Sequence, residues 1–288
     1  MDRDLLRQFG SSVKFDYNLA HLTWLKVGGN AEVFYRPNSL EELCKFLKFL
    51  PKDTPINFIG AGSNLLIRDG GVDGVVIKLG GGFNYIKLDE VFLTVGAATL
   101  NYSLATFCQQ NAIQGFEFLI GIPGNIGGGI AMNAGAHGRE FKDVVHSIVA
   151  ISINNGNTLE IPAADIGFLY RGNSLPADLL FLEAKLNYQY GAKDEIERKM
   201  QAISQQRNST QPVKEKTCGS IFANPAGYKS WQLLDKVGMR GYNLNGAKIS
   251  DLHCNFFINA SNATAKDLEL LGELARSRVL QAFGIDLC

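Results

Sequence analysis

The segment TCGSIFANP, residues 217–225, places Ser220 between a glycine and an apolar pair. A serine in this setting could be a hydrolase nucleophile, a turn residue or a proton donor. The nucleophile motif GxSxG is absent, and no histidine is identifiable as the base for this serine. The hydrolase interpretation is therefore disfavoured, and the other two stay open.

A second side chain with chemical capacity is Arg171, in the segment YRGNS. A guanidinium keeps its charge at any working pH and donates hydrogen bonds in a fixed fork, which suits a carboxylate that gains charge. The commonest fate of an arginine is a surface ion pair. The residue type alone does not decide between these two roles.

Two glycine-rich stretches provide candidate binding loops. The first, GAGSNLL at residues 60–66, follows an apolar strand but is not a dinucleotide fingerprint, because GxGxxG would need glycine where Leu65 stands. It also lacks the GK[ST] of a P-loop. The stretch is either a backbone cradle for a phosphate or an ordinary turn.

The second stretch, residues 115–138, holds eight glycines together with many large apolar residues. Such glycine density costs conformational entropy on folding. A flexible surface loop would carry polar residues instead, so the stretch predicts a buried ligand site lined by main chain.

The composition excludes several classes of partner. The chain carries 28 basic and 28 acidic residues, which argues against nucleic acid or an anionic membrane as partner. Its five cysteines form no CxxC pair and its four histidines lack ligand spacing, so we expect reduced thiols and no metal site. The charged N-terminus and the absence of a long apolar run predict no signal peptide and no membrane span. We therefore expect a soluble, cytoplasmic protein.

Strand and helix patterns alternate through the first half of the chain. NAEVFY at residues 30–35 predicts a strand, and the next segment predicts a helix capped by Ser39. The pattern changes near Gly191, where the chain becomes polar and glycine becomes sparse. A long amphipathic helix is predicted from about Thr264. These patterns indicate α/β or α+β layers followed by a smaller α+β domain.

Six segments of the chain, taken in order and spacing, resemble the UDP-N-acetylenolpyruvoylglucosamine reductases, the MurB family. They are LKVGGNAEVFYRP, IGAGSNLLIRDGGVDGVVI, IGIPGNIGGGIAMNAGAHG, FLYRGNS, CGSIFANP and GAKISDLHCNFFIN. The resemblance runs from about Asn18 to the last residue, and the short passage after Arg171 is typical of the family variant without an extra tyrosine loop.

The resemblance implies an α+β fold with an FAD-binding portion of the vanillyl-alcohol-oxidase type in two subdomains, followed by a smaller substrate-binding domain. The expected boundaries are 1–82, 83–190 and 191–288. It also implies residues that hold FAD, with the first five around the pyrophosphate and the rest along the flavin. These are Gly60, Ala61, Gly62, Ser63, Asn64, Gly121, Ile122, Pro123, Gly124, Gly127, Gly128, Asn133, Ala134 and Gly135.

The family uses NADPH to reduce FAD, and then reduces UDP-N-acetylglucosamine enolpyruvate to UDP-N-acetylmuramate for peptidoglycan. By resemblance, Arg171 stabilises the enolate that hydride addition creates, and Ser220 protonates it. A hydroxyl is a weak acid, but a developing carbanion is basic enough to take its proton. Asn224 and Lys214 are the implied substrate contacts, and the expected enzyme is a monomer.

The family places a catalytic glutamate shortly after its final helix. Here the sequence FGIDLC reaches Cys288 about two residues before that position, and Asp286 matches an earlier, non-catalytic acidic position. We expect a chain ending at Cys288 to fold and bind FAD but to turn over poorly.

Two other interpretations of the sequence stay open. One is a different FAD-dependent oxidoreductase of the same superfamily, which would share the glycine loops but not CGSIFANP. The other is a non-catalytic protein that binds a nucleotide sugar, which would be colourless on purification.

Overall fold

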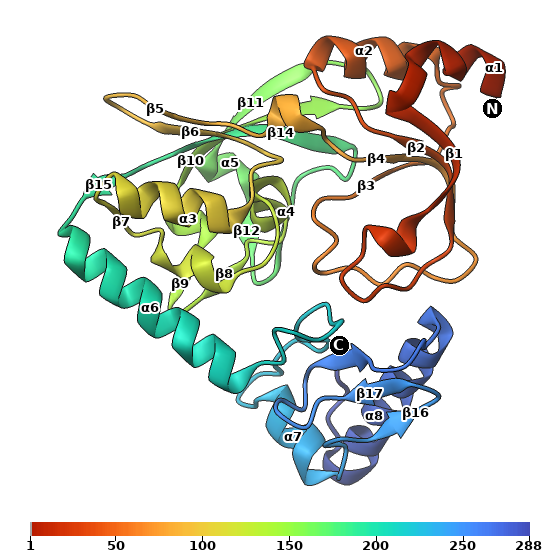
Figure 1. Ribbon diagram of the computed structural model, residues 1–288, viewed down its shortest axis with the longest axis vertical. Coiled ribbons are helices and arrows are strands. Elements are labelled where there is room, and N and C mark those ends of the chain that lie inside the picture. The colour runs from red at the N-terminus through yellow and green to blue at the C-terminus, as the bar shows by residue number, and fades with distance from the viewer. Residues whose placement is uncertain (1) are drawn as a thin grey trace. The chain divides into compact units, whose positions relative to one another are not determined.

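The computed structural model describes residues 2–288, which pack into two compact units (Figure 1). The first unit comprises the chain up to Phe15, Val33–Ala61 and Asp73–Gln205. The second comprises Asp16–Glu32, Gly62–Val72 and Gln206–Cys288. Two loops from the N-terminal part of the chain therefore belong to the unit that contains the C-terminus.

A four-stranded sheet with the order β1-β2-β4-β3 lies mostly in the first unit. Its strands are β1 (Val13–Asn18), β2 (Asn30–Tyr35), β4 (Val72–Ile77) and β3 (Ile56–Phe58), of which β3 and β4 are parallel. The N-terminal part of the chain also forms the α-helix α1 (Arg3–Leu6) and two 3-10 helices, labelled η, which are η1 (Arg7–Ser12) and η2 (Leu19–His21). Helix α2 (Leu40–Phe49) begins after Ser39, whose side chain accepts a hydrogen bond from the Glu42 N–H, so the predicted cap is confirmed.

A five-stranded antiparallel sheet completes the first unit. Its order is β11 (Thr158–Pro162), β10 (Val145–Ser152), β14 (Leu179–Leu186), β6 (Leu93–Gly96) and β5 (Ile86–Leu88). Around it lie η3 (Gly81–Phe83), α3 (Asn101–Gln110), η4 (Glu117–Gly121), α4 (Ile126–Ala131), η5 (Phe141–Asp143) and α5 (Ala163–Ile166). The core between these elements is apolar, with Leu104, Phe116, Phe141 and Ile148 almost fully buried.

The first unit also contains three short strand pairs. They are β7 (Ile113–Gln114) with β15 (Gln189–Tyr190), β8 (Gly135–Ala136) with β9 (Arg139–Glu140), and β12 (Phe168–Leu169) with β13 (Gly172–Asn173). The last two pairs carry Gly135 and Arg171, which the sequence analysis predicts to lie in the active site.

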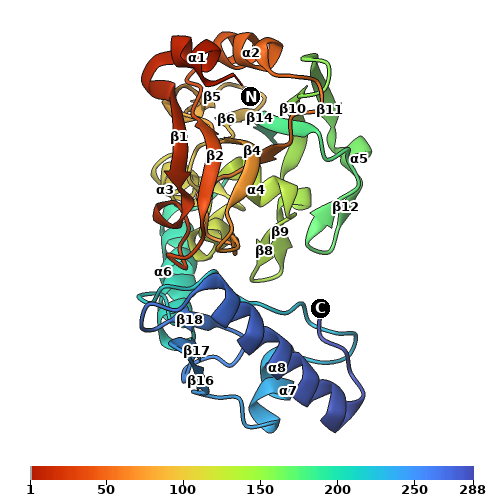
Figure 2. The same cartoon turned by 90° about the vertical axis from the view of Figure 1, so that its right-hand side faces the viewer.

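The second unit contains a three-stranded antiparallel sheet and a long helix. The strands are β16 (Asn243–Leu244), β17 (Ala247–Ile249) and β18 (Phe257–Asn259), and the helices beside them are α7 (Ser230–Lys236) and α8 (Ala265–Phe283) (Figure 2). Helix α8 starts with a capping box of Thr264 and Asp267 and ends at Gly284, where φ is 67°. Helix α6 (Lys193–Thr210) begins in the first unit and ends in the second.

The predicted α+β fold class is confirmed by this mixture of sheets and helices. The predicted division at residues 82 and 190 stays a prediction, since compact packing separates two units and does not test a division within the FAD-binding portion. Among residues 2–288, no helix is long and apolar enough to cross a membrane.

Candidate active site

Arg171 lies at the tip of the β12–β13 hairpin, in a two-residue loop with Tyr170. Its backbone has φ of 62°, a left-handed conformation that costs an ordinary residue energy. The guanidinium lies 4.9 Å from the centre of the Tyr170 ring, and its Nη2 donates a hydrogen bond to the Gly135 carbonyl at 3.1 Å. The side chain is 40% exposed, so the guanidinium is accessible to solvent although these two contacts fix its position.

Asn133 is the residue that ties this hairpin to the neighbouring segment. Its buried amide nitrogen donates to the Leu169 carbonyl at 3.0 Å and to Glu140 Oε2 at 3.1 Å. Its amide oxygen accepts from the Lys142 N–H at 3.0 Å. These three bonds give Asn133 a structural role, and its predicted contact with the flavin stays a prediction.

Glu140 is the acidic residue nearest to Arg171, with 3.9 Å between Oε1 and Nη1. The hydrogen bond from Lys142 keeps the pKa of Glu140 below its usual range, helped by the bond from Asn133 and by the charges of Lys142 and Arg171. Glu140 is therefore ionised near neutral pH and already has a closer cationic partner, Lys142 at 2.8 Å. Because Lys142 is the closer partner of Glu140, the Arg171 guanidinium can also bind the carboxylate of a ligand.

The glycine-rich stretch is hydrogen-bonded to the first residue of α3 and to the segment before that helix. The Asn101 side chain donates to the Ile122 carbonyl at 3.2 Å, and the Asn101 N–H donates to the Gly124 carbonyl at 3.0 Å. The Gly127 N–H donates to the Ala97 carbonyl at 2.9 Å. A Cβ at Gly127 would lie 3.0 Å from the Ala97 Cβ, so glycine is needed for this close approach.

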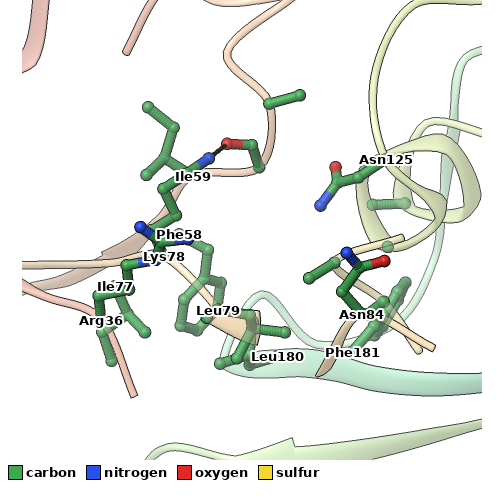
Figure 3. Close-up of a pocket in the computed structure, with 18 of the residues that line it drawn as sticks. Arg36, Phe58, Ile59, Ile77, Lys78, Leu79, Asn84, Asn125, Leu180 and Phe181 are labelled. Carbon is green, nitrogen blue, oxygen red and sulfur yellow. Dashed lines mark hydrogen bonds between the residues drawn. The ribbon is translucent and has the colours of Figure 1, made fainter. Parts of the chain in front are cut away.

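A cavity of about 360 Å³ opens between the first glycine loop and α4 (Figure 3). Its walls are segments 58–61, 77–81, 97–98, 127–128 and 179–181, together with Arg36, Asn84, Leu100, Asn125 and Ala131. Four of the fourteen predicted cofactor residues line it, namely Gly60, Ala61, Gly127 and Gly128. The other ten lie outside its walls, and their role stays a prediction.

Four polar side chains of this cavity were not predicted from the sequence. Arg36 and Lys78 stand on one side, and Asn84 and Asn125 stand on the other (Figure 3). The Lys78 ammonium donates a hydrogen bond to the Gly60 carbonyl. Burial lowers the pKa of Lys78, and the charge of Arg36 lowers it further. A lysine directly after the apolar strand residues VVI, and two residues before three consecutive glycines, is the sequence signal that could have identified it.

The walls of this cavity fit the FAD that the resemblance implies. A Cβ at Gly60 would lie 2.3 Å from Asn125 Oδ1, so glycine allows the Asn125 amide to lie close to the main chain of the first glycine loop. Alanine and leucine side chains suit a flat apolar ring, and two cations suit a diphosphate.

The second half of the first glycine loop belongs to the second unit. Gly62 has φ of 67°, its carbonyl accepts from the Trp24 N–H at 3.0 Å, and a Cβ there would lie 2.0 Å from the Leu22 carbonyl oxygen. Ser63 is buried and Asn64 is exposed. This geometry requires glycine at residue 62 for packing, whatever the loop binds.

Ser220 lies in the second unit on a segment that pairs with residues before and within β18. It forms an antiparallel bridge with Phe256, and the Ile221 N–H donates to the Asn255 carbonyl at 2.9 Å. The serine is exposed, and within residues 2–288 its hydroxyl has no hydrogen-bond partner. The hydroxyl can therefore donate to a ligand without breaking an internal bond.

The two predicted substrate contacts lie near Ser220 along the chain, Lys214 before it and Asn224 after it. The Asn224 amide oxygen accepts from the Ser230 N–H at 3.0 Å and thus supports the start of α7. Lys214 is exposed. Both remain predictions as substrate contacts.

The residues that the structure describes contain no cluster of three or more potential metal ligands. His253 and Cys254 have separate partners, since His253 Nδ1 accepts from the Asn255 N–H at 3.2 Å and Cys254 Sγ lies 3.6 Å from Asp235. All five cysteines are free thiols.

Comparison with known proteins identifies the family. A family model described as the C-terminal domain of UDP-N-acetylenolpyruvoylglucosamine reductase matches residues 211–288, and one described as an FAD binding domain matches residues 31–162. Proteins named UDP-N-acetylenolpyruvoylglucosamine reductase from Rickettsia massiliae (strain Mtu5) and Rickettsia prowazekii (strain Madrid E) are 56% and 54% identical over 274 residues. That alignment covers 95% of this chain and 92% of each relative.

A solved structure gives the same result. The UDP-N-acetylenolpyruvylglucosamine reductase (MurB) of Thermus caldophilus matches with a TM-score of 0.83 and 32% identity over 96% of both chains. The expected FAD-binding fold is confirmed by this match and by the matched FAD binding domain. Since more than half of the residues are identical over 95% of the chain, this chain belongs to the UDP-N-acetylenolpyruvoylglucosamine reductase family.

Proposed function

We propose that this chain reduces UDP-N-acetylglucosamine enolpyruvate to UDP-N-acetylmuramate, with NADPH as reductant and FAD as cofactor, and so supplies peptidoglycan precursor synthesis. The observation that carries the proposal is the pair Arg171 and Ser220. Both stand at the family's motif positions, and both are exposed for contact with a ligand. When bound, FAD would supply the redox chemistry, which is hydride transfer from NADPH to the enolpyruvyl group.

The cavity between Gly60 and α4 is where the chain would hold FAD. The main chain of Gly60, Ala61, Gly127 and Gly128 lines it, and Lys78 and Asn125 supply a cation and an amide at its wall. Lys78 also fixes the Gly60 carbonyl, which orients the peptide that follows.

Arg171 is proposed to stabilise the charge that hydride addition pushes into the substrate carboxylate. Its position is set by Gly135, by the Tyr170 ring and by the Asn133 network, so little reorganisation accompanies binding. The fork of the guanidinium matches the two oxygens of a carboxylate.

Ser220 is proposed to complete the reaction by proton transfer. Its Oγ–H gives a proton to the carbon next to the carboxylate, and the electron pair of the enolate forms the new C–H bond. The serine oxygen is left as an alkoxide that must be reprotonated before the next turnover. Asn224 and Lys214 are proposed to contact the substrate beside it.

The substrates, NADPH and a UDP-sugar, are metabolites of the cytoplasm, and we propose that the protein acts there as a monomer. Light scattering of the FAD-loaded protein measures the monomer directly. A dimer at micromolar concentration would contradict it.

Rapid mixing tests the proposed function. NADPH-reduced protein is mixed without oxygen with UDP-N-acetylglucosamine enolpyruvate, and flavin absorbance reports reoxidation. We expect Ser220→Ala to leave reduction by NADPH intact and to slow reoxidation by at least about 100-fold. Ser209→Ala, an exposed serine of α6, serves as the matched control and should reoxidise at the native rate. A native rate in Ser220→Ala would remove Ser220 from the mechanism, and a native protein that is not reoxidised would reject the function.

A further inference from the structure

The segment 216–222, which carries Ser220, pairs through its main chain with the segment 255–259. Toward its start, the Asn259 N–H donates to the Lys216 carbonyl at 3.0 Å, and toward its end the Ile221 N–H donates to the Asn255 carbonyl. Ser220 itself pairs with Phe256. Because the serine hydroxyl has no partner among the described residues, this main-chain pairing is what fixes the position of Ser220 and the direction of its Cα–Cβ bond.

The pairing shifts by one residue just before Ser220. If the register at Ser220 and Phe256 continued, Thr217 would stand opposite Asn259, yet the Asn259 N–H reaches the carbonyl of Lys216. Gly219, with φ of 88°, lies within the shifted stretch. An extra residue of this kind in one strand re-aims the side chain that follows it and weakens the local ladder.

The Asn255 side chain binds the main chain of Phe222, on the other side of Ser220 from the shift in register. Its Nδ2 donates to the Phe222 carbonyl at 2.8 Å, and its Oδ1 accepts from the Phe222 N–H at 3.0 Å. Both main-chain groups of Phe222 are thus satisfied by one side chain. Asn255 is 4% exposed, so water does not readily replace these bonds.

We propose that Asn255 is a positioning residue for Ser220. Its amide binds both main-chain groups of Phe222 and so fixes the segment 216–222, which keeps the Ser220 hydroxyl in the place needed for proton transfer. This inference rests on the proposed role of Ser220. Asn255 acts through the main chain and needs no contact with the substrate.

Asn259 provides a matched comparison in the same unit. It is 5% exposed, its amide donates to the Leu25 carbonyl at 3.0 Å, and its oxygen accepts from the Ala263 N–H at 2.9 Å. Its side chain therefore makes the same pair of bonds to main chain, but to residues other than 220–222. Loss of either amide removes similar bonds, and only one of them supports Ser220.

The test is a double-mutant cycle in the FAD-loaded full chain, with reoxidation by UDP-N-acetylglucosamine enolpyruvate as the rate. We expect Asn255→Ala to slow reoxidation by roughly 10- to 100-fold, the scale for a misplaced reacting group, and to leave reduction by NADPH unchanged. In the Ser220→Ala background the same substitution should change the rate by less than about twofold, since the group it positions is gone. Asn259→Ala should reoxidise at close to the native rate.

The outcomes separate the two claims. A native rate in Ser220→Ala rejects the proposed role of the serine, whatever Asn255 does. If Ser220→Ala is slow, the positioning role is rejected by any of three results: an unchanged Asn255→Ala, an equal loss in both backgrounds, or an equal loss in Asn259→Ala. If Asn255→Ala gives no yellow, folded protein, Asn255→Asp carries the same cycle, because it keeps the shape and the oxygen that accepts from Phe222.

Discussion

Asn133 offers the sharpest test of how the structure supports Arg171. The substitutions are Asn133→Ala and Asn133→Gly. Each removes the bonds to Leu169, Glu140 and the Lys142 N–H, at 3.0, 3.1 and 3.0 Å. They differ in backbone preference, because Asn133 has φ of 39°, in the left-handed region.

The expected magnitude follows from these contacts. Each hydrogen bond contributes about 1 kcal/mol net, so the loss of three costs about 3 kcal/mol. Alanine adds the cost of a left-handed conformation, while glycine gives back part of its advantage through its greater freedom in the unfolded chain. We therefore expect the glycine variant to be about 1 kcal/mol more stable than the alanine variant.

Thermal unfolding of the FAD-free protein measures both effects. A loss of this size should lower the Tm by roughly 10 °C. Asn187→Ala, at an exposed asparagine of the same unit, is the control and should leave the Tm nearly unchanged. Equal Tm values for the alanine and glycine variants would contradict the backbone argument. A shift below about 2 °C in both would refute the claim that Asn133 is a structural support.

Three further predictions concern the cavity, the first glycine loop and the half-buried His253. Lys78→Met should weaken FAD binding by about 10- to 100-fold, as expected for the loss of a charged hydrogen bond. Lys52→Met, at an exposed site, is the control and should weaken binding less. Flavin fluorescence titration of the apoprotein measures both affinities, and equal affinities would exclude Lys78 from the FAD site. Gly62→Ala should cost at least about 1–2 kcal/mol in thermal unfolding, whereas Gly70→Ala, with open space around it, should be neutral; equal Tm values would show that the loop relaxes. Burial lowers the pKa of His253, so the unfolded chain binds more protons and stability falls as the pH drops below about 6.5. Between about pH 7.5 and 5.5 the native Tm should therefore fall more than that of His253→Gln, and parallel Tm curves would contradict the assignment.

Local sequence signals predicted several elements correctly. The Ser39 cap, the strand at residues 30–35 and the helix beginning after Thr264 occur as expected. Each depends on residues within one turn or one strand, so its signal is contained in a short window.

The candidate site was predicted in part. Motif order pointed to Arg171, Ser220 and the glycine loops, and the structure brings Gly60, Ala61, Gly127 and Gly128 to one cavity. The sequence did not indicate that the Asn133 amide is used internally, because its partners lie up to 36 residues away.

Short motifs and caps were enough to indicate the family resemblance, the α+β class and the residue types available for chemistry, because these signals are local and ordered along the chain. Tertiary structure decided which side chains meet. Asp69 accepts hydrogen bonds from the N–H groups of Ala265 and Lys266 at the start of α8, and Asn259 binds the Leu25 carbonyl. Contacts across some 200 residues depend on packing of the whole unit, which leaves no mark in a local window. For that reason two N-terminal loops join the C-terminal unit, and the supports of Ser220 and Arg171 became visible only in the fold.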